Sequence, residues 1–104
     1  MKEITLNYDK IEWKDAPEYQ EGTQIKMLRE EGKKKTFFIK LPKGFRGAPH
    51  IFTVNEQHII LEGSYKDEGI LYEAGTYRFI PVGNAHDGTI SEEGALILVI
   101  QEPA

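Results

Sequence analysis

Hydrophobic residues in this chain occur in short runs that alternate with polar positions and end at glycine, proline, asparagine or aspartate. Alternation with a period of two indicates β-strands, because successive strand side chains point to opposite faces of a sheet. The run "TFFIKL" at 36–41 is aromatic and β-branched and stops at Pro42, and "ALILVI" at 95–100 is nearly all apolar. Turn signals recur at roughly 8–12 residues, which favours an all-β sandwich or barrel.

Further strands are expected between these two runs. A hairpin is predicted from 49–54 and 56–62, with Asn55 as its turn. The segment 25–31 is compatible with either a short helix or a strand. The remaining predicted strands are 64–66, 70–72 and 76–80.

The first 22 residues are more polar than the rest and contain the only tryptophan, Trp13. Ile11 and Trp13 alternate with polar neighbours, which argues for partial burial. We expect 1–22 to form an arm that packs on the body or on a second subunit. Residues 23–102 would form a β-barrel, so that 1–104 is a single domain.

Composition narrows the function classes. The chain has 104 residues, 39% of them hydrophobic, which suits one folded domain rather than a disordered segment. Its net charge of −4 and the absence of a basic stripe argue against a nucleic-acid partner. Cysteine is absent, which excludes disulfides, thiolate metal sites and a cysteine nucleophile. No apolar run approaches membrane length, so we expect a cytoplasmic protein with no membrane partner.

The stretch "HIFTVNEQHIILEG" at 50–63 carries the candidate chemistry. Strand alternation places His50 and Phe52 on one face, and Glu56, His58 and Ile60 on one face after the turn. An inward glutamate or histidine in a β core is costly unless it is paired or binds a metal. The residues expected to face outward are Gln57, Ile59 and Leu61.

The chain has three histidines, His50, His58 and His86. Without cysteine, imidazole and carboxylate groups are the expected ligands for Zn, Fe, Mn, Ni or Cu. A single histidine in a β-rich chain is more often a satisfied or surface residue than a ligand. Their joint spacing with Glu56 is what favours a metal site.

Two sets of residues stand at fixed spacings. The first set reads Gly44, five residues, His50, one residue, Phe52, three residues, Glu56, six residues, Gly63. The second set reads Gly75, five residues, Pro81, one residue, Gly83, two residues, His86, three residues, Ile90. They resemble the cupin motifs G-x5-H-x-H-x(3–4)-E-x6-G and G-x5-P-x-G-x2-H-x3-N. Eight positions agree with these motifs in residue type.

The resemblance implies an all-β, cupin-type double-stranded β-helix, which is a jelly-roll barrel. The flanking sequence, such as "IEWKDAPEYQEGTQIKMLRE" at 11–30, is similar to that of single-domain ChrR-type cupins. That group includes the cupin domain of zinc-binding anti-sigma factors. The chain leaves no room for a sigma-binding helical domain, so we do not expect an anti-sigma role. The resemblance also implies a homodimer.

By the resemblance, His50, Glu56 and His86 match the metal ligands of the family, and the cofactor would be a divalent Fe, Mn, Zn or Ni ion. Phe52 replaces the second histidine of the first motif and cannot coordinate. Three outcomes follow: an open three-ligand site, a site in which His58 supplies the missing ligand, or a degenerate site that binds no metal and leaves an apolar pocket gated by Phe52.

Two functions remain open at this point. The first is a metal-dependent enzyme, dioxygenase-like or a related oxidoreductase, that acts on a small organic molecule. Its pocket would be shaped by Phe52, Tyr77 and Phe79, of which the latter two also suit plain barrel core. Asp87 would be either a partner for His86 or a loop cap. The second is a non-catalytic module that binds or senses a metal or small ligand.

Overall fold

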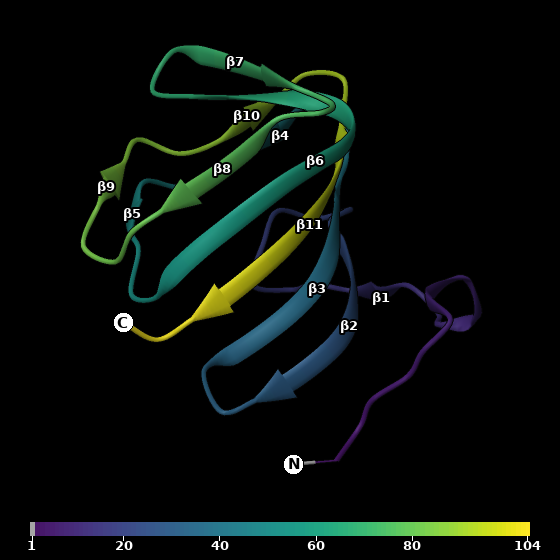
Figure 1. Cartoon of the computed structure of the whole chain (residues 1–104). Coiled ribbons are helices and arrows are strands. Elements are labelled where there is room, and N and C mark those ends of the chain that lie inside the picture. Colours follow the sequence, from purple (N-terminus) through teal and green to yellow (C-terminus); the bar gives the residue numbers. More distant parts are fainter. Residues whose placement is uncertain (1) are drawn as a thin grey trace.

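The computed structural model describes residues 2–104, in which strands predominate and no α-helix occurs (Figure 1). No helix in that range is long and apolar enough to cross a membrane. The elements are η1 (Tyr8–Lys10), β1 (Lys14–Asp15), β2 (Gln24–Glu31), β3 (Lys34–Leu41), β4 (Phe45–Arg46), β5 (His50–Ile51), β6 (Asn55–Asp67), β7 (Ile70–Glu73), β8 (Tyr77–Ile80), β9 (Ala85–His86), β10 (Ile90–Ser91) and β11 (Ala95–Glu102).

The strands form one strongly curled antiparallel sheet, and a separate two-stranded sheet stands beside it (Figure 1). The large sheet runs β1-β2-β3-β11-β6-β10-β4, and β7 and β8 also pair with β6. The small sheet is β5-β9. The all-β prediction is confirmed. The core inside the curl consists of Phe37, Ile39, Leu41, Phe45, Ile60, Tyr65, Ala95, Ile97 and Val99.

Strand β6 is the longest element and takes part in both halves of the barrel. Its first half pairs with β11 and β8, and its second half pairs with β7 and β10. Gly63 lies at the change of partner with a φ of 73°. A register irregularity at Leu96/Ile97 lies opposite the same region. Such an irregularity increases strand bending, which lets β6 pass from one half to the other.

The predicted hairpin at Asn55 is corrected by the structure. Only His50–Ile51 is a strand, and it pairs with β9 instead of β6. The backbone of Phe52 continues this pairing, donating to Asn84 O at 3.0 Å and accepting from Gly83 N at 2.8 Å. The first motif therefore lies against the second. The ambiguous segment 25–31 forms part of strand β2.

The arm contacts the outer surface of β2 and β3. The Tyr8 ring lies 4.9 Å from that of Phe38. Lys26 Nζ donates to Tyr8 O at 2.9 Å and lies 4.8 Å from the centre of the Trp13 ring, which Lys40 Nζ also approaches at 5.1 Å. Cation–π contacts of this kind attach Trp13 to the sheet surface.

Candidate functional site

A cavity of about 570 Å³ opens inside the barrel. Most of its lining is apolar and comes from strands β3 and β11 and from the segment before β6. The apolar residues are Phe37, Ile39, Leu41, Phe45, Ala48, Ile51, Phe52, Val54, Ile97 and Val99. One wall is polar, and its residues include His50, Glu56, His58, Tyr65 and Gln101. An apolar cavity with a few convergent polar groups is the usual form of a small-molecule site.

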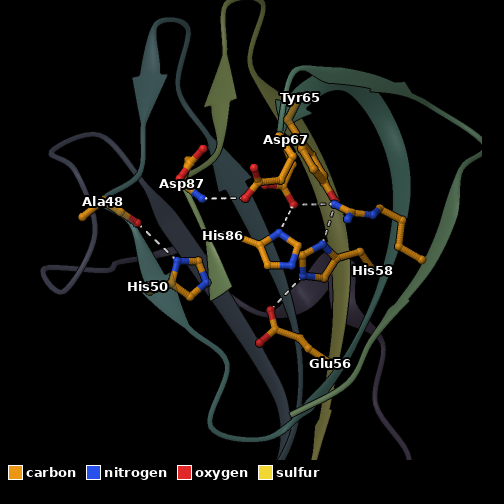
Figure 2. Close-up of polar contacts among 10 residues, drawn as sticks. Ala48, His50, Glu56, His58, Tyr65, Asp67, His86 and Asp87 are labelled. Atoms are coloured by element: carbon orange, nitrogen blue, oxygen red, sulfur yellow. Dashed lines mark hydrogen bonds and ion pairs between the residues drawn. The ribbon is translucent and has the colours of Figure 1, made fainter. Parts of the chain in front are cut away.

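The polar wall is held together by hydrogen bonds along the inner face of β6 (Figure 2). His58 Nε2 donates to Glu56 Oε1 at 2.7 Å, and the Tyr65 hydroxyl donates to His58 Nδ1 at 2.7 Å. We assign these directions because Arg78 donates to the Tyr65 oxygen at 3.1 Å, which leaves the phenol proton for His58. Gln101 Nε2 donates to Glu56 Oε2 at 3.2 Å. Both oxygens of Glu56 and both ring nitrogens of His58 are therefore engaged.

The network continues from Tyr65 to His86. Arg78 Nη1 donates to Asp67 Oδ2 at 2.9 Å. His86 Nδ1 donates to the same oxygen at 2.5 Å. The carboxylate of Asp67 is only 4% exposed, and Arg78 is 14% exposed. A buried ion pair thus orients the imidazole of His86.

Three groups in or beside the cavity have raised pKa values, those of Tyr65, Arg78 and Tyr19. Burial raises the pKa of the Tyr65 phenol, even though its hydrogen bond from Arg78 acts in the opposite direction. Burial by itself lowers the pKa of Arg78, but its bonds to Asp67 and Tyr65 outweigh that effect and raise it. Burial together with the charges of Glu56 and Glu18 raises the pKa of Tyr19 to about 12. Both tyrosines that line the cavity therefore keep their phenol protons at physiological pH.

The predicted ligands His50 and His86 lie directly opposite each other across β5 and β9. The Phe52 ring contacts both of them, with centroid distances of 4.5 Å to His50 and 5.0 Å to His86. His50 is exposed, and its Nδ1 bonds to Ala48 O at 3.2 Å. Figure 2 shows its ring well apart from Glu56.

The side chains of His50, Glu56 and His86 are not gathered as one ligand set in this structure. Their ligand atoms do not gather within 4.8 Å, whereas within residues 2–104 those of Asp67, Glu68 and His86 do. Glu56 is occupied by His58 and Gln101. Metal binding by the motif residues stays a prediction that requires their ligand atoms to come closer together.

The structure also shows the contacts of His58, the candidate replacement ligand, and of Asp87, the candidate partner for His86. His58 does not offer a free nitrogen as a replacement ligand, because its ring bridges Glu56 and Tyr65. Asp87 is not the carboxylate that holds His86; that residue is Asp67, twenty positions earlier on β6. The backbone nitrogen of Asp87 instead donates to Glu68.

Tyr77 and Phe79 lie outside the cavity, which corrects their expected place in the pocket. Their side chains are 57% and 54% exposed. Strand β8 pairs with β6 so that Arg78 lies opposite His58, and the alternation of the strand then turns Tyr77 and Phe79 outward. Phe52, which is buried, lines the cavity as expected.

Sequence reasoning missed four members of the network: Tyr65, Asp67, Arg78 and Gln101. Tyr65 and Asp67 alternate on β6 beyond Gly63, which is a signal for one shared inner face. No sequence signal placed Arg78 against them, because that contact depends on the pairing of β8 with β6.

The fold and the motif spacing agree with a known family, since residues 1–104 match the family model described as the ChrR cupin-like domain. The chain belongs to the ChrR-type cupins. No curated protein matches it.

Several solved cupins share this fold. An RmlC-like cupin from Shewanella frigidimarina NCIMB 400 is 20% identical, with a TM-score of 0.78 over 100% of this chain and 93% of that one. A putative acetylacetone dioxygenase from Methylibium petroleiphilum PM1 is 18% identical, with a TM-score of 0.88 over 97% and 77%. The anti-sigma factor ChrR from Rhodobacter sphaeroides, in complex with SigE, is 17% identical, with a TM-score of 0.75 over 92% of this chain and 52% of that one. At these identities the likeness establishes the jelly-roll fold.

Proposed function

We propose that this cupin binds a small organic molecule in its barrel cavity, without a metal ion at the motif position. The observation that carries the proposal is the closed network on the cavity wall. Glu56 and His58 satisfy each other, and Gln101 and Tyr65 complete their hydrogen bonds. A metal ion at this position would have to compete with His58 for Glu56 Oε1 and with Gln101 for Glu56 Oε2. In this chain both carboxylate oxygens of Glu56 already accept hydrogen bonds, one from His58 and one from Gln101.

The lining indicates the kind of ligand. The apolar wall suits a hydrocarbon or aromatic body of modest size, because it gains from removal of apolar surface from water. The partly accessible edges of Glu56 and His58, with side chains 15% and 13% exposed, would meet one polar end of that body. Such a protein would act as a binding or sensor module.

A bulky substitution in the cavity should abolish binding of the amphiphilic fluorescent probe 8-anilinonaphthalene-1-sulfonate, whose aromatic rings suit the apolar part of the lining. Val99 is 3% exposed and lies on β11 between Phe37 and His58. Val99→Trp would fill space inside the barrel, so we expect most of the probe's fluorescence enhancement to be lost. EDTA should leave the enhancement of the unaltered protein unchanged, because no metal is required.

Leu98→Trp is the matched control, because Leu98 is next to Val99 on β11 but faces the outside of the sheet. This variant should keep the enhancement. Circular dichroism would verify that both variants are folded. Equal probe binding by Val99→Trp and the unaltered protein would contradict the cavity as the binding site.

A metal-dependent reaction, dioxygenase-like as in the neighbouring acetylacetone enzyme, is the second candidate. It is supported by the motif spacing and by the position of His50 opposite His86. It would require the ligand atoms of His50, Glu56 and His86 to come together, in competition with the bond between Glu56 and His58. Reconstitution with Fe(II) should then produce oxygen uptake that depends on a 1,3-diketone and is lost in Glu56→Gln. Stoichiometric Fe, Mn, Zn or Ni without turnover would favour a binding module, and no oxygen uptake would reject this candidate.

Homodimer formation stays a prediction. Exposed apolar side chains on the outer face of β6 and β8 support it, since a second copy would remove them from water. They are Leu61, Tyr77 and Phe79.

A further inference from the structure

We propose that Asp67, Glu68 and His86 bind one divalent transition-metal ion, as a ligand set that shares only His86 with the cupin motif. Each of the three residues offers a ligand atom, and these atoms lie within 4.8 Å of one another. Asp67 ends β6, Glu68 follows it in the turn to β7, and His86 ends β9. The site therefore lies where the small sheet meets the body of the barrel.

The strongest observation is an unsatisfied oxygen on Asp67. The side chain is 4% exposed, and its Oδ2 accepts from both His86 and Arg78. Its Oδ1 is buried and has no hydrogen-bond partner in the structure. Because a buried carboxylate oxygen without a partner is costly, a cation beside Oδ1 would remove a penalty that the protein alone leaves in place.

Glu68 supplies the second carboxylate and the route from solvent. Its side chain is exposed, and its Oε1 accepts from the backbone nitrogen of Asp87 at 2.9 Å. Since Asp87 directly follows His86, this bond holds the Glu68 carboxylate beside the imidazole. An ion could reach the site from the surface and keep water on that side.

Charge and donor type favour a cation. Two carboxylates face one guanidinium, that of Arg78, so with a neutral His86 the group carries a net negative charge. One imidazole and two carboxylates suit Zn²⁺, Mn²⁺ or Fe²⁺ better than Mg²⁺ or Ca²⁺, which prefer oxygen ligands alone. On binding, a neutral His86 would move its proton from Nδ1 to Nε2 by exchange with solvent, and Nδ1 would exchange its bond to Asp67 for one to the metal, while Arg78 keeps Asp67 Oδ2.

Isothermal titration calorimetry of the full chain with Zn²⁺ tests the proposal, because it measures both stoichiometry and affinity. We expect one ion per chain. Glu68→Gln should weaken binding about ten-fold or more, because loss of even an outer partner of a metal ligand typically weakens affinity 10–100-fold. Zn²⁺ should also raise the melting temperature of the unaltered protein more than that of Glu68→Gln, because the ion binds only the native state.

Two control variants separate this site from others. Glu73→Gln removes an exposed carboxylate from the neighbouring strand β7, and His50→Ala removes an exposed ligand of the cupin motif. Both should bind Zn²⁺ like the unaltered protein. The proposal is overturned if no stoichiometric ion binds, if Glu68→Gln binds equally well, or if His50→Ala abolishes binding. Probe binding in the barrel should be unaffected by Glu68→Gln, so failure here leaves the proposed function standing.

Discussion

Gly63→Ala is expected to abolish the native barrel. Gly63 has a φ of 73°, where only glycine is free of strain. A Cβ atom at this position would lie 2.0 Å from the carbonyl oxygen of Gly94 and 2.9 Å from Ala95 Cα. Both are backbone atoms at the start of β11 and cannot rotate away. We expect the free energy of unfolding to fall by about 4 kcal/mol or more, because a steric clash with the backbone and strain at a positive φ act together. Urea denaturation followed by circular dichroism measures it.

Gly69→Ala is the matched control for this prediction. Gly69 has a similar φ of 76°, but a Cβ atom there would meet nothing within 4 Å. Only backbone strain is introduced, so we expect a loss of about 1–2 kcal/mol. If both variants lose the same amount, then contact with Gly94 does not matter and the close approach of β6 and β11 is more adaptable than the structure indicates.

Arg78→Met is expected to cause the largest loss of stability among substitutions in the polar network. It leaves the carboxylate of Asp67, which is 4% exposed, without its cation and removes one donor to Tyr65. Breaking a buried pair from one side typically costs about 3–5 kcal/mol. Lys66→Met, at an exposed position of the same strand as Asp67, should change stability by about 0.5 kcal/mol or less. Thermal and urea unfolding of both variants make the comparison.

The double variant Asp67→Asn, Arg78→Met sharpens this result. Removing the negative charge as well eliminates the unpaired buried ion, so the double variant should be less destabilised than the sum of the two single variants. A coupling free energy of about 1–3 kcal/mol is expected for residues in direct contact within one network. Strict additivity would show that Asp67 is protonated or hydrated in the native state and that the ion pair is not a source of stability.

The prediction for Arg78 bears on the function as well as on the fold. Arg78 donates to both Tyr65 and Asp67, and so it connects the cavity wall to His86. A ligand that alters the Glu56–His58 pair would therefore change the hydrogen bonds of Tyr65 and Arg78 as well. Conversely, a metal ion on Asp67 would act on the same arginine. The barrel cavity and the proposed metal site are thus connected by a continuous series of hydrogen bonds through Arg78.

The barrel and the inner face of β6 could be predicted from the sequence, because they rest on local features. Alternation is fixed by strand geometry, so Glu56, His58 and Ile60 turn inward together and Leu61 turns outward. Glycines at positive φ, such as Gly63 and Gly75, mark turns and crossings that other residues adopt with strain. Their spacing was enough to identify the family.

What the sequence did not determine is which side chains meet across strands that are distant in the chain. His50 lies opposite His86, and Asp67 rather than Asp87 holds His86, because β5 pairs with β9 and β9 lies against the end of β6. The inward position of Arg78 follows from the register of β8 on β6. By itself the sequence determined the fold and the polarity of β6. Only the tertiary structure decided that Glu56 is paired with His58, because a hydrogen-bond partner is selected by distance in space.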